Sequence, residues 1–119
     1  MNSRPKILLI DRAPDRKDRI NALKNRGYAV FPALSMEEAR SRCLRGGYDL
    51  IVVNANGEHP QSVEFCDDIR RQCPKQHLIL CTDGDSGREY AVGSDTESVV
   101  RAVESALPVA KAADLASAA

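Results

Sequence analysis

Short apolar runs alternate along the chain with longer segments in which apolar residues recur at helical spacing. Four of the runs have the length and apolar character of strands buried in a parallel sheet, and they span residues 6–10, 28–33, 49–54 and 77–82. A fifth, weaker run spans residues 89–92. Because strands and helices alternate, the pattern predicts an α/β fold in which helices cover both faces of a parallel sheet.

Residues with known capping preferences mark the first two helices. Pro14 suits a first helical position and Gly27 suits a C-terminal cap, so we expect the first helix between them. Ser35 and Glu38 have the spacing of a capping box, and the two glycines at positions 46–47 should end the second helix.

Two further helices are predicted in the second half of the chain. Apolar residues share one helical face over residues 61–73 and again over residues 96–107. Ser94 and Glu97 repeat the capping-box spacing before the latter segment, and Pro108 should end or kink it.

Length and charge narrow the class of protein. The chain has 119 residues, which fits one domain, and we assign that domain to residues 1–108 and an alanine-rich tail to residues 109–119. Seventeen basic residues balance seventeen acidic ones, so no overall charge favours nucleic acid or a membrane surface. No apolar run approaches the roughly 18 residues needed to cross a bilayer, and no export-signal core follows the N-terminus. We therefore expect a cytoplasmic protein that binds neither nucleic acid nor membrane.

The four cysteines lie where the pattern predicts core. They are Cys43, Cys66, Cys73 and Cys81. No pair has the two-residue spacing of a zinc knuckle or a redox motif, and free cysteine is among the most buried residue types. We interpret all four as small core residues, the alternative being a reactive or metal-binding thiol, and we expect no metal and no cofactor.

Polar residues at the carboxyl ends of the strands are the candidates for function. In parallel sheets these ends meet at one edge, where loops form binding and catalytic sites. Asp11 and Arg12 follow the first run, Asn54 ends the third and Thr82 ends the fourth. Asn54 is unexpected because an amide is uncharged and is a poor nucleophile. The alternative is a structural role, since the segment "NANG" (54–57) is rich in turn-forming residues.

The order and spacing of these strand ends resemble a receiver domain of a two-component response regulator (CheY-like). The stretches that carry the resemblance are "KILLIDRAPDR", "GYAVFPALSMEEA", "GGYDLIVVN" and "HLILCT", and together they cover residues 6 to about 82. The resemblance implies a flavodoxin-like three-layer α/β/α sandwich whose central, mainly parallel sheet has five strands in the order 2-1-3-4-5.

The resemblance also shows where this sequence departs from the family. The aspartate that accepts a phosphoryl group in receivers falls at Asn54, and an amide cannot take that role. The acidic pair that holds Mg²⁺ falls at Asp11 and Arg12, so one carboxylate has become a guanidinium. A family carbonyl ligand falls at Asn56, and Thr82 retains the switch hydroxyl. We expect poor Mg²⁺ affinity.

Two more departures concern the last part of the fold. The family's lysine after strand five is missing, because "EYAVGSDTE" (89–97) contains no lysine. Only residues 83–88 separate the fourth and fifth runs, too few for a helix and two loops, so the family's fourth helix should be missing. The fifth strand is then either parallel, which the resemblance favours, or antiparallel in a hairpin. Loss of the helix would uncover an interaction surface for which Tyr90, Val92 and Arg101 are candidates.

These features predict a non-catalytic pseudo-receiver that acts through contacts with a kinase, an effector or a second copy of itself, the last as a homodimer. One alternative is an anion or nucleotide-fragment binder that uses Asp11, Arg12, Asn54 and Thr82, although no glycine-rich phosphate loop supports it. Another is a phosphotransfer protein that uses Asp11 or Asp49, but Asp49 starts its strand at the opposite end. Arg12 is expected either to pair with Asp11 or to lie in solvent.

Overall fold

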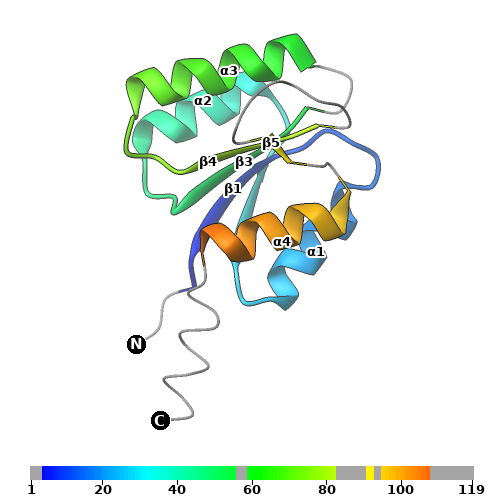
Figure 1. Cartoon of the computed structure of the whole chain (residues 1–119). Helices are drawn as coiled ribbons and strands as arrows, with labels where there is room; N and C mark the ends of the chain where they lie inside the picture. The colour runs from blue at the N-terminus through cyan, green and yellow to red at the C-terminus, as the bar shows by residue number, and fades with distance from the viewer. Residues whose placement is uncertain (1–3, 56–58, 83–90, 93–94, 108–119) are drawn as a thin grey trace.

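The computed structural model describes residues 4–55, 59–82, 91–92 and 95–107 (Figure 1). Along this part of the chain the elements are β1 (Lys6–Ile10), α1 (Arg16–Asn25), β2 (Ala29–Ala33), α2 (Met36–Arg45), β3 (Leu50–Asn54), α3 (His59–Gln72), β4 (Leu78–Cys81), β5 (Ala91–Val92) and α4 (Thr96–Ala106). Each of the four main apolar runs forms a strand whose ends lie within one residue of the prediction.

The strands form a parallel sheet in the order β2-β1-β3-β4, as the alternating pattern predicts. Beyond β4 the two residues of β5 pair with it in the parallel direction, with Leu80 opposite Ala91. The described part of strand five is therefore not the antiparallel arm of a hairpin. The predicted loss of a helix between β4 and β5 falls on residues 83–90, which lie outside the described residues.

Helices cover both faces of the sheet: α1 and α4 lie on one face, and α2 and α3 lie on the other (Figure 1). Side chains alternate along β1, so Ile7 and Leu9 face α1 and α4, whereas Leu8 and Ile10 face α2 and α3. The central strand β3 is buried along its whole length, as expected for a parallel strand that is covered on both faces.

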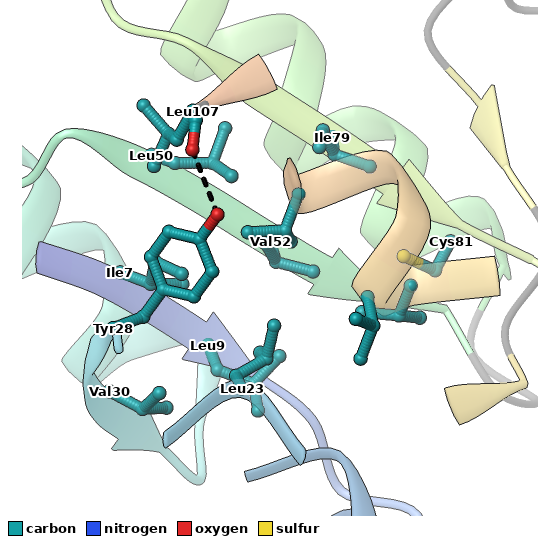
Figure 2. Packing of buried hydrophobic residues seen from close by; sticks show 13 residues of the cluster. Ile7, Leu9, Leu23, Tyr28, Val30, Leu50, Val52, Ile79, Cys81 and Leu107 are labelled. Atoms are coloured by element: carbon teal, nitrogen blue, oxygen red, sulfur yellow. Dashed lines mark hydrogen bonds between the residues drawn. The ribbon is translucent and has the colours of Figure 1, made fainter. Parts of the chain in front are cut away.

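The core on the α1 and α4 side includes one buried polar contact. Tyr28, which precedes β2, donates a hydrogen bond of 2.8 Å from its hydroxyl to the backbone oxygen of Leu107 at the end of α4 (Figure 2). The ring packs among apolar side chains of β1 and β3, including Ile7 and Leu50 (Figure 2). This bond joins the end of α4 to the segment that precedes β2.

The helix boundaries follow capping chemistry, with two corrections. Ser35 caps α2 as predicted, because its hydroxyl accepts a hydrogen bond from the backbone N–H of Glu38. Helix α4 is capped by the carboxylate of Asp95, which accepts from the N–H of Ser98, rather than by the predicted Ser94, which lies outside the described residues. Helix α1 begins at Arg16, two residues after Pro14, with Asp15 at the N-cap position.

The cysteines mostly pack in the core, as predicted. Cys43, Cys66 and Cys81 are buried and Cys73 is partly buried, and all are free thiols. Burial raises the pKa of Cys43 to about 11 and that of Cys81 to about 12, so neither thiol forms a nucleophilic thiolate at neutral pH. Within the described ranges, no helix is both long enough and apolar enough to cross a membrane.

Candidate functional site

The carboxyl ends of three neighbouring parallel strands, β1, β3 and β4, lie side by side at the same end of the sheet. Ile10 of β1 lies opposite Val53 of β3, so Asp11 and Asn54 follow at the same level. Asn54 in turn lies opposite Cys81 of β4, which places Thr82 one residue beyond it. All three polar side chains are buried: Asp11 is 2% exposed, Asn54 7% and Thr82 8%.

The carboxylate of Asp11 is held by Arg19, a buried arginine of α1 that the pattern of strand ends does not predict as a site residue. Arg19 donates from Nε to Oδ2 of Asp11 at 2.5 Å and from Nη2 to Oδ1 at 3.2 Å. The backbone N–H of Ala13 also donates to Oδ1 of Asp11, at 3.0 Å. Arg19 is itself only 2% exposed, so this two-bond ion pair is shielded from water.

A second carboxylate completes the cluster around Arg19. Asp15, one helical turn before Arg19, accepts from Nη1 at 3.0 Å and from Nη2 at 2.7 Å. Burial by itself would lower the pKa of Arg19, but hydrogen bonds to Asp15 and Asp11 outweigh it and raise that pKa. The hydrogen bond from Arg19 in turn lowers the pKa of Asp15. The guanidinium is therefore cationic at every physiological pH and faces two carboxylates.

This donor set does not suit a divalent metal ion. Both oxygens of Asp11 already accept hydrogen bonds from Arg19, and the guanidinium offsets the negative charge of that carboxylate, which a hard cation would require. Among the described residues no group of three or more His, Cys, Asp or Glu side chains could hold a metal. Arg12, the other cation at this strand end, has an exposed side chain.

The other predicted site residues either lie away from the carboxyl ends of these strands or fall outside the described residues. Asn56 and Tyr90 lie outside the described residues, and of Val92 only the backbone in β5 is described. Arg101 lies on the exposed side of α4, where it pairs with Glu97 one turn earlier. The proposed interaction surface therefore rests on α4 alone in the described part of the chain.

Asp49 has a structural contact at the opposite end of β3. Its Oδ2 accepts a hydrogen bond of 2.7 Å from the backbone N–H of Lys6, which joins the start of β3 to the start of β1. Because the amino ends of parallel strands lie at the opposite edge from Asn54, Asp49 cannot contribute to chemistry at the strand-end site. This removes the Asp49 version of the phosphotransfer alternative.

Solved structures with the same fold are plentiful. A CheY-like receiver domain protein from Methanospirillum hungatei JF-1 superposes with a TM-score of 0.74 at 15% identity, over 92% of this chain and 98% of that chain. In the structure of histidine kinase ThkA in complex with response regulator TrrA, the match has a TM-score of 0.69 at 22% identity, over 87% of this chain and 98% of the other. The fold is that of response regulator receiver domains.

The receiver fold is also seen in TrrA from Thermotoga maritima in complex with Mg²⁺-BeF, which matches with a TM-score of 0.61 at 28% identity, over 71% of this chain and 74% of that chain. No model of a known protein family matches the sequence, and no curated protein matches it. The likeness to these proteins therefore rests on structure.

Arg19 is the site residue that a receiver-like pattern does not anticipate. Its signal in the sequence is its spacing: it lies four residues before Leu23, on the buried stripe of α1, and four residues after Asp15. A charged residue on the apolar face of a helix requires a partner, and the partners available were the carboxylates at the end of β1 and at the start of α1.

Proposed function

We propose that this chain is a receiver-like signalling module of a two-component or phosphorelay system that cannot be phosphorylated at the usual site and acts through protein contacts rather than as an enzyme. The observation that carries the proposal is the position of Asn54, a buried amide at the end of β3. By resemblance to receivers, this is the position of the acceptor aspartate. A carboxylate oxygen attacks phosphorus, whereas an amide oxygen has little nucleophilicity and leaves no stable acyl phosphate.

The surroundings of Asn54 support the same function. The neighbouring carboxylate, Asp11, is bound by Arg19 and Ala13, so it is available neither as a nucleophile nor as a ligand for Mg²⁺. The proposal includes a full fifth strand and a β4–β5 connection without a helix, because only residues 83–88 separate the two apolar runs. In such a module the output depends on which protein is bound and not on a phosphoryl group.

A similar solved structure contains a protein partner. TrrA has been crystallised with the histidine kinase ThkA, and we infer by likeness that a kinase, an effector or a second copy of this chain binds here. The exposed side of α4, which carries Arg101 and Glu97, is the described part of the surface that we assign to such contacts.

The anion-binding alternative has weaker support from the same geometry. An anion site needs a cation with spare hydrogen-bond donors, but the buried guanidinium of Arg19 is engaged by Asp11 and Asp15. Because Asp11 and Asp15 together carry two negative charges against the one positive charge of Arg19, this cluster is negative overall, which disfavours phosphate.

The proposal is tested by offering the chain a phosphoryl donor. We expect that acetyl phosphate with Mg²⁺ adds no phosphoryl group detectable by intact mass spectrometry, and that beryllofluoride leaves the amide NMR spectrum unchanged around Asn54 and Thr82. TrrA treated in parallel provides the positive control, because its complex with Mg²⁺-BeF is known. A mass increase of one phosphoryl group that is lost at alkaline pH would overturn the proposal.

The variant Asn54→Asp separates the nucleophile from its surroundings. Restoring the carboxylate supplies an acceptor, but Arg12 and the missing lysine still disable the site, so we expect no phosphorylation of this variant either. If Asn54→Asp becomes phosphorylated while the unaltered chain does not, the amide alone is responsible. Sedimentation of the unaltered chain, together with pull-down by a cognate kinase, then tests the role of protein contacts.

A further inference from the structure

One nitrogen of the Arg19 guanidinium, Nη2, donates hydrogen bonds to two different carboxylates. Nη2 donates to Oδ1 of Asp11 at 3.2 Å and to Oδ1 of Asp15 at 2.7 Å. The remaining two nitrogens donate to the second oxygen of each carboxylate, Nε to Asp11 and Nη1 to Asp15. All four carboxylate oxygens therefore converge on one side chain, and two of them converge on one atom.

Two carboxylates that converge on a cation would otherwise repel one another. The Asp11 carboxylate is buried at the end of β1 and cannot move into water, whereas the side chain of Asp15, at the N-cap position of α1, is 59% exposed and is held beside Asp11 by its bonds to Arg19. Without a positive charge between them, the Asp11 carboxylate would be left unpaired in a shielded site, which is strongly unfavourable. Such a pair of hard oxygen donors would attract a divalent cation.

We propose that Arg19 is an internal cation that closes this site to divalent metal ions, and that removing its charge turns Asp11 and Asp15 into a divalent-cation site. Because Arg19 is part of α1, it is always present at the site, and a free ion has to displace the buried two-bond ion pair between Arg19 and Asp11. This inference does not rest on the proposed function: it concerns the cation between Asp11 and Asp15, whereas phosphoryl acceptance concerns Asn54.

The test replaces Arg19 with an uncharged residue of similar length and measures cation binding. In Arg19→Met we expect Mn²⁺ to broaden the amide resonances of Asp11 and Ala13 selectively, with affinity at least about tenfold tighter than in the unaltered chain. Millimolar Mg²⁺ should raise the thermal midpoint of Arg19→Met by several degrees and leave that of the unaltered chain unchanged.

Three control variants identify the cause of the effect. Lys17→Met removes one positive charge from an exposed position on the same helix and should show no cation response. Arg19→Lys keeps the charge and should also stay unresponsive. The double variant Asp11→Asn with Arg19→Met removes the buried carboxylate as well, so it should fold without a cation and bind none.

Each remaining outcome counts against the inference. Selective broadening near Asp11 in the unaltered chain would show that Arg19 does not close the site, and an equal response in Arg19→Lys or Lys17→Met would show that its charge is not what matters. If Arg19→Met does not fold, it is refolded with Mg²⁺: recovery supports the inference, and failure to recover while the double variant folds overturns it.

Discussion

Arg19 and Asp11 form a pair in which each charge is buried because of the other. Taking a guanidinium and a carboxylate out of water costs several kcal/mol for each ion, and the cost is offset only by good geometry and further hydrogen bonds. Both conditions hold here, because two bonds join the pair and Ala13 and Asp15 supply additional partners. The net gain from such a pair is small, but the penalty for removing one member is large.

The stability of the pair is measured by a double-mutant cycle in a metal-free buffer. Arg19→Met should lower the free energy of unfolding by about 3–5 kcal/mol, because the Asp11 carboxylate is left buried without its counter-ion. Adding Asp11→Asn should restore part of that loss, with a coupling energy of at least about 1 kcal/mol. Urea denaturation gives the free energy of unfolding of the unaltered chain, of each single variant and of the double variant. If the loss in the double variant equals the sum of the losses in the two single variants, the two charges do not depend on each other.

The residues of the candidate site show which features of a site can be predicted from a sequence. Asp11, Asn54 and Thr82 were predicted correctly as strand-end residues, because the apolar runs place the strand ends within one residue. Arg19 was missed because a helical pattern assigns charged residues to the solvent side. Only three-dimensional proximity shows that the start of α1 packs against the end of β1 closely enough to pair Arg19 with Asp11.

At the scale of elements, the ends of α2 are fixed by two different physical effects. The start depends on a hydrogen bond from the N–H of Glu38 to the Ser35 hydroxyl. The end depends on backbone conformation, since Gly46 has φ 75° and ψ −166°, a region that is essentially restricted to glycine. Its N–H donates to the carbonyls of Arg42 and Cys43, which closes the last turn.

Gly46→Ala should destabilise the protein although there is room for the added methyl group. No heavy atom lies within 4 Å of the position that a Cβ would take at Gly46, so a clash is not the cause. The cost is the strained backbone, about 1–3 kcal/mol. Urea denaturation should show this loss for Gly46→Ala, whereas Arg45→Ala at the preceding exposed position should change stability by no more than about 0.5 kcal/mol. Equal stability of the two variants would mean that the chain relaxes to another conformation there.

Capping also shows why element boundaries are harder to predict than the elements themselves. Ser94 and Asp95 are adjacent residues that can both cap a helix, and each has a suitable partner three residues later. The structure uses Asp95, whose backbone is extended and whose carboxylate reaches Ser98. Helix α4 itself is predictable from the sequence, because Val99, Val100 and Val103 form its buried stripe.

In the whole molecule, apolar packing and a few polar bonds hold α1 and α4 together and join them to the rest of the fold. Arg26 of the α1 C-cap pairs with Glu104 of α4 at 2.8 Å on the surface. The buried hydroxyl of Tyr28 donates to the carbonyl of Leu107, one of the carbonyls at the end of α4 that lack a partner within the helix. The exposed ion pair contributes little, whereas the buried bond is shielded from water.

Because of the buried hydroxyl of Tyr28, the free energy of unfolding should decrease as the pH becomes alkaline. Burial, and then the charge of Glu104, raises the pKa of Tyr28 above its ordinary value. A phenol whose pKa is raised by folding contributes stability that is fully present below the unfolded pKa of about 10 and is lost as the pH rises through the folded pKa, because the folded state then holds a proton that the unfolded chain releases. An ionised Tyr28 also cannot donate to Leu107.

Tyr28→Phe separates this contribution from every other titration. At neutral pH the variant should be less stable by about 1 kcal/mol, because the carbonyl of Leu107 loses its buried donor. Above about pH 10 the unaltered chain should lose stability more steeply than the variant, so the two unfolding curves, measured in urea at each pH, should converge. Tyr48→Phe leaves the bond from Tyr28 to Leu107 in place and should follow the unaltered chain. A constant difference between the unaltered chain and Tyr28→Phe at every pH would mean that the pKa of Tyr28 is the same in the folded and the unfolded chain, so that folding does not hold its proton.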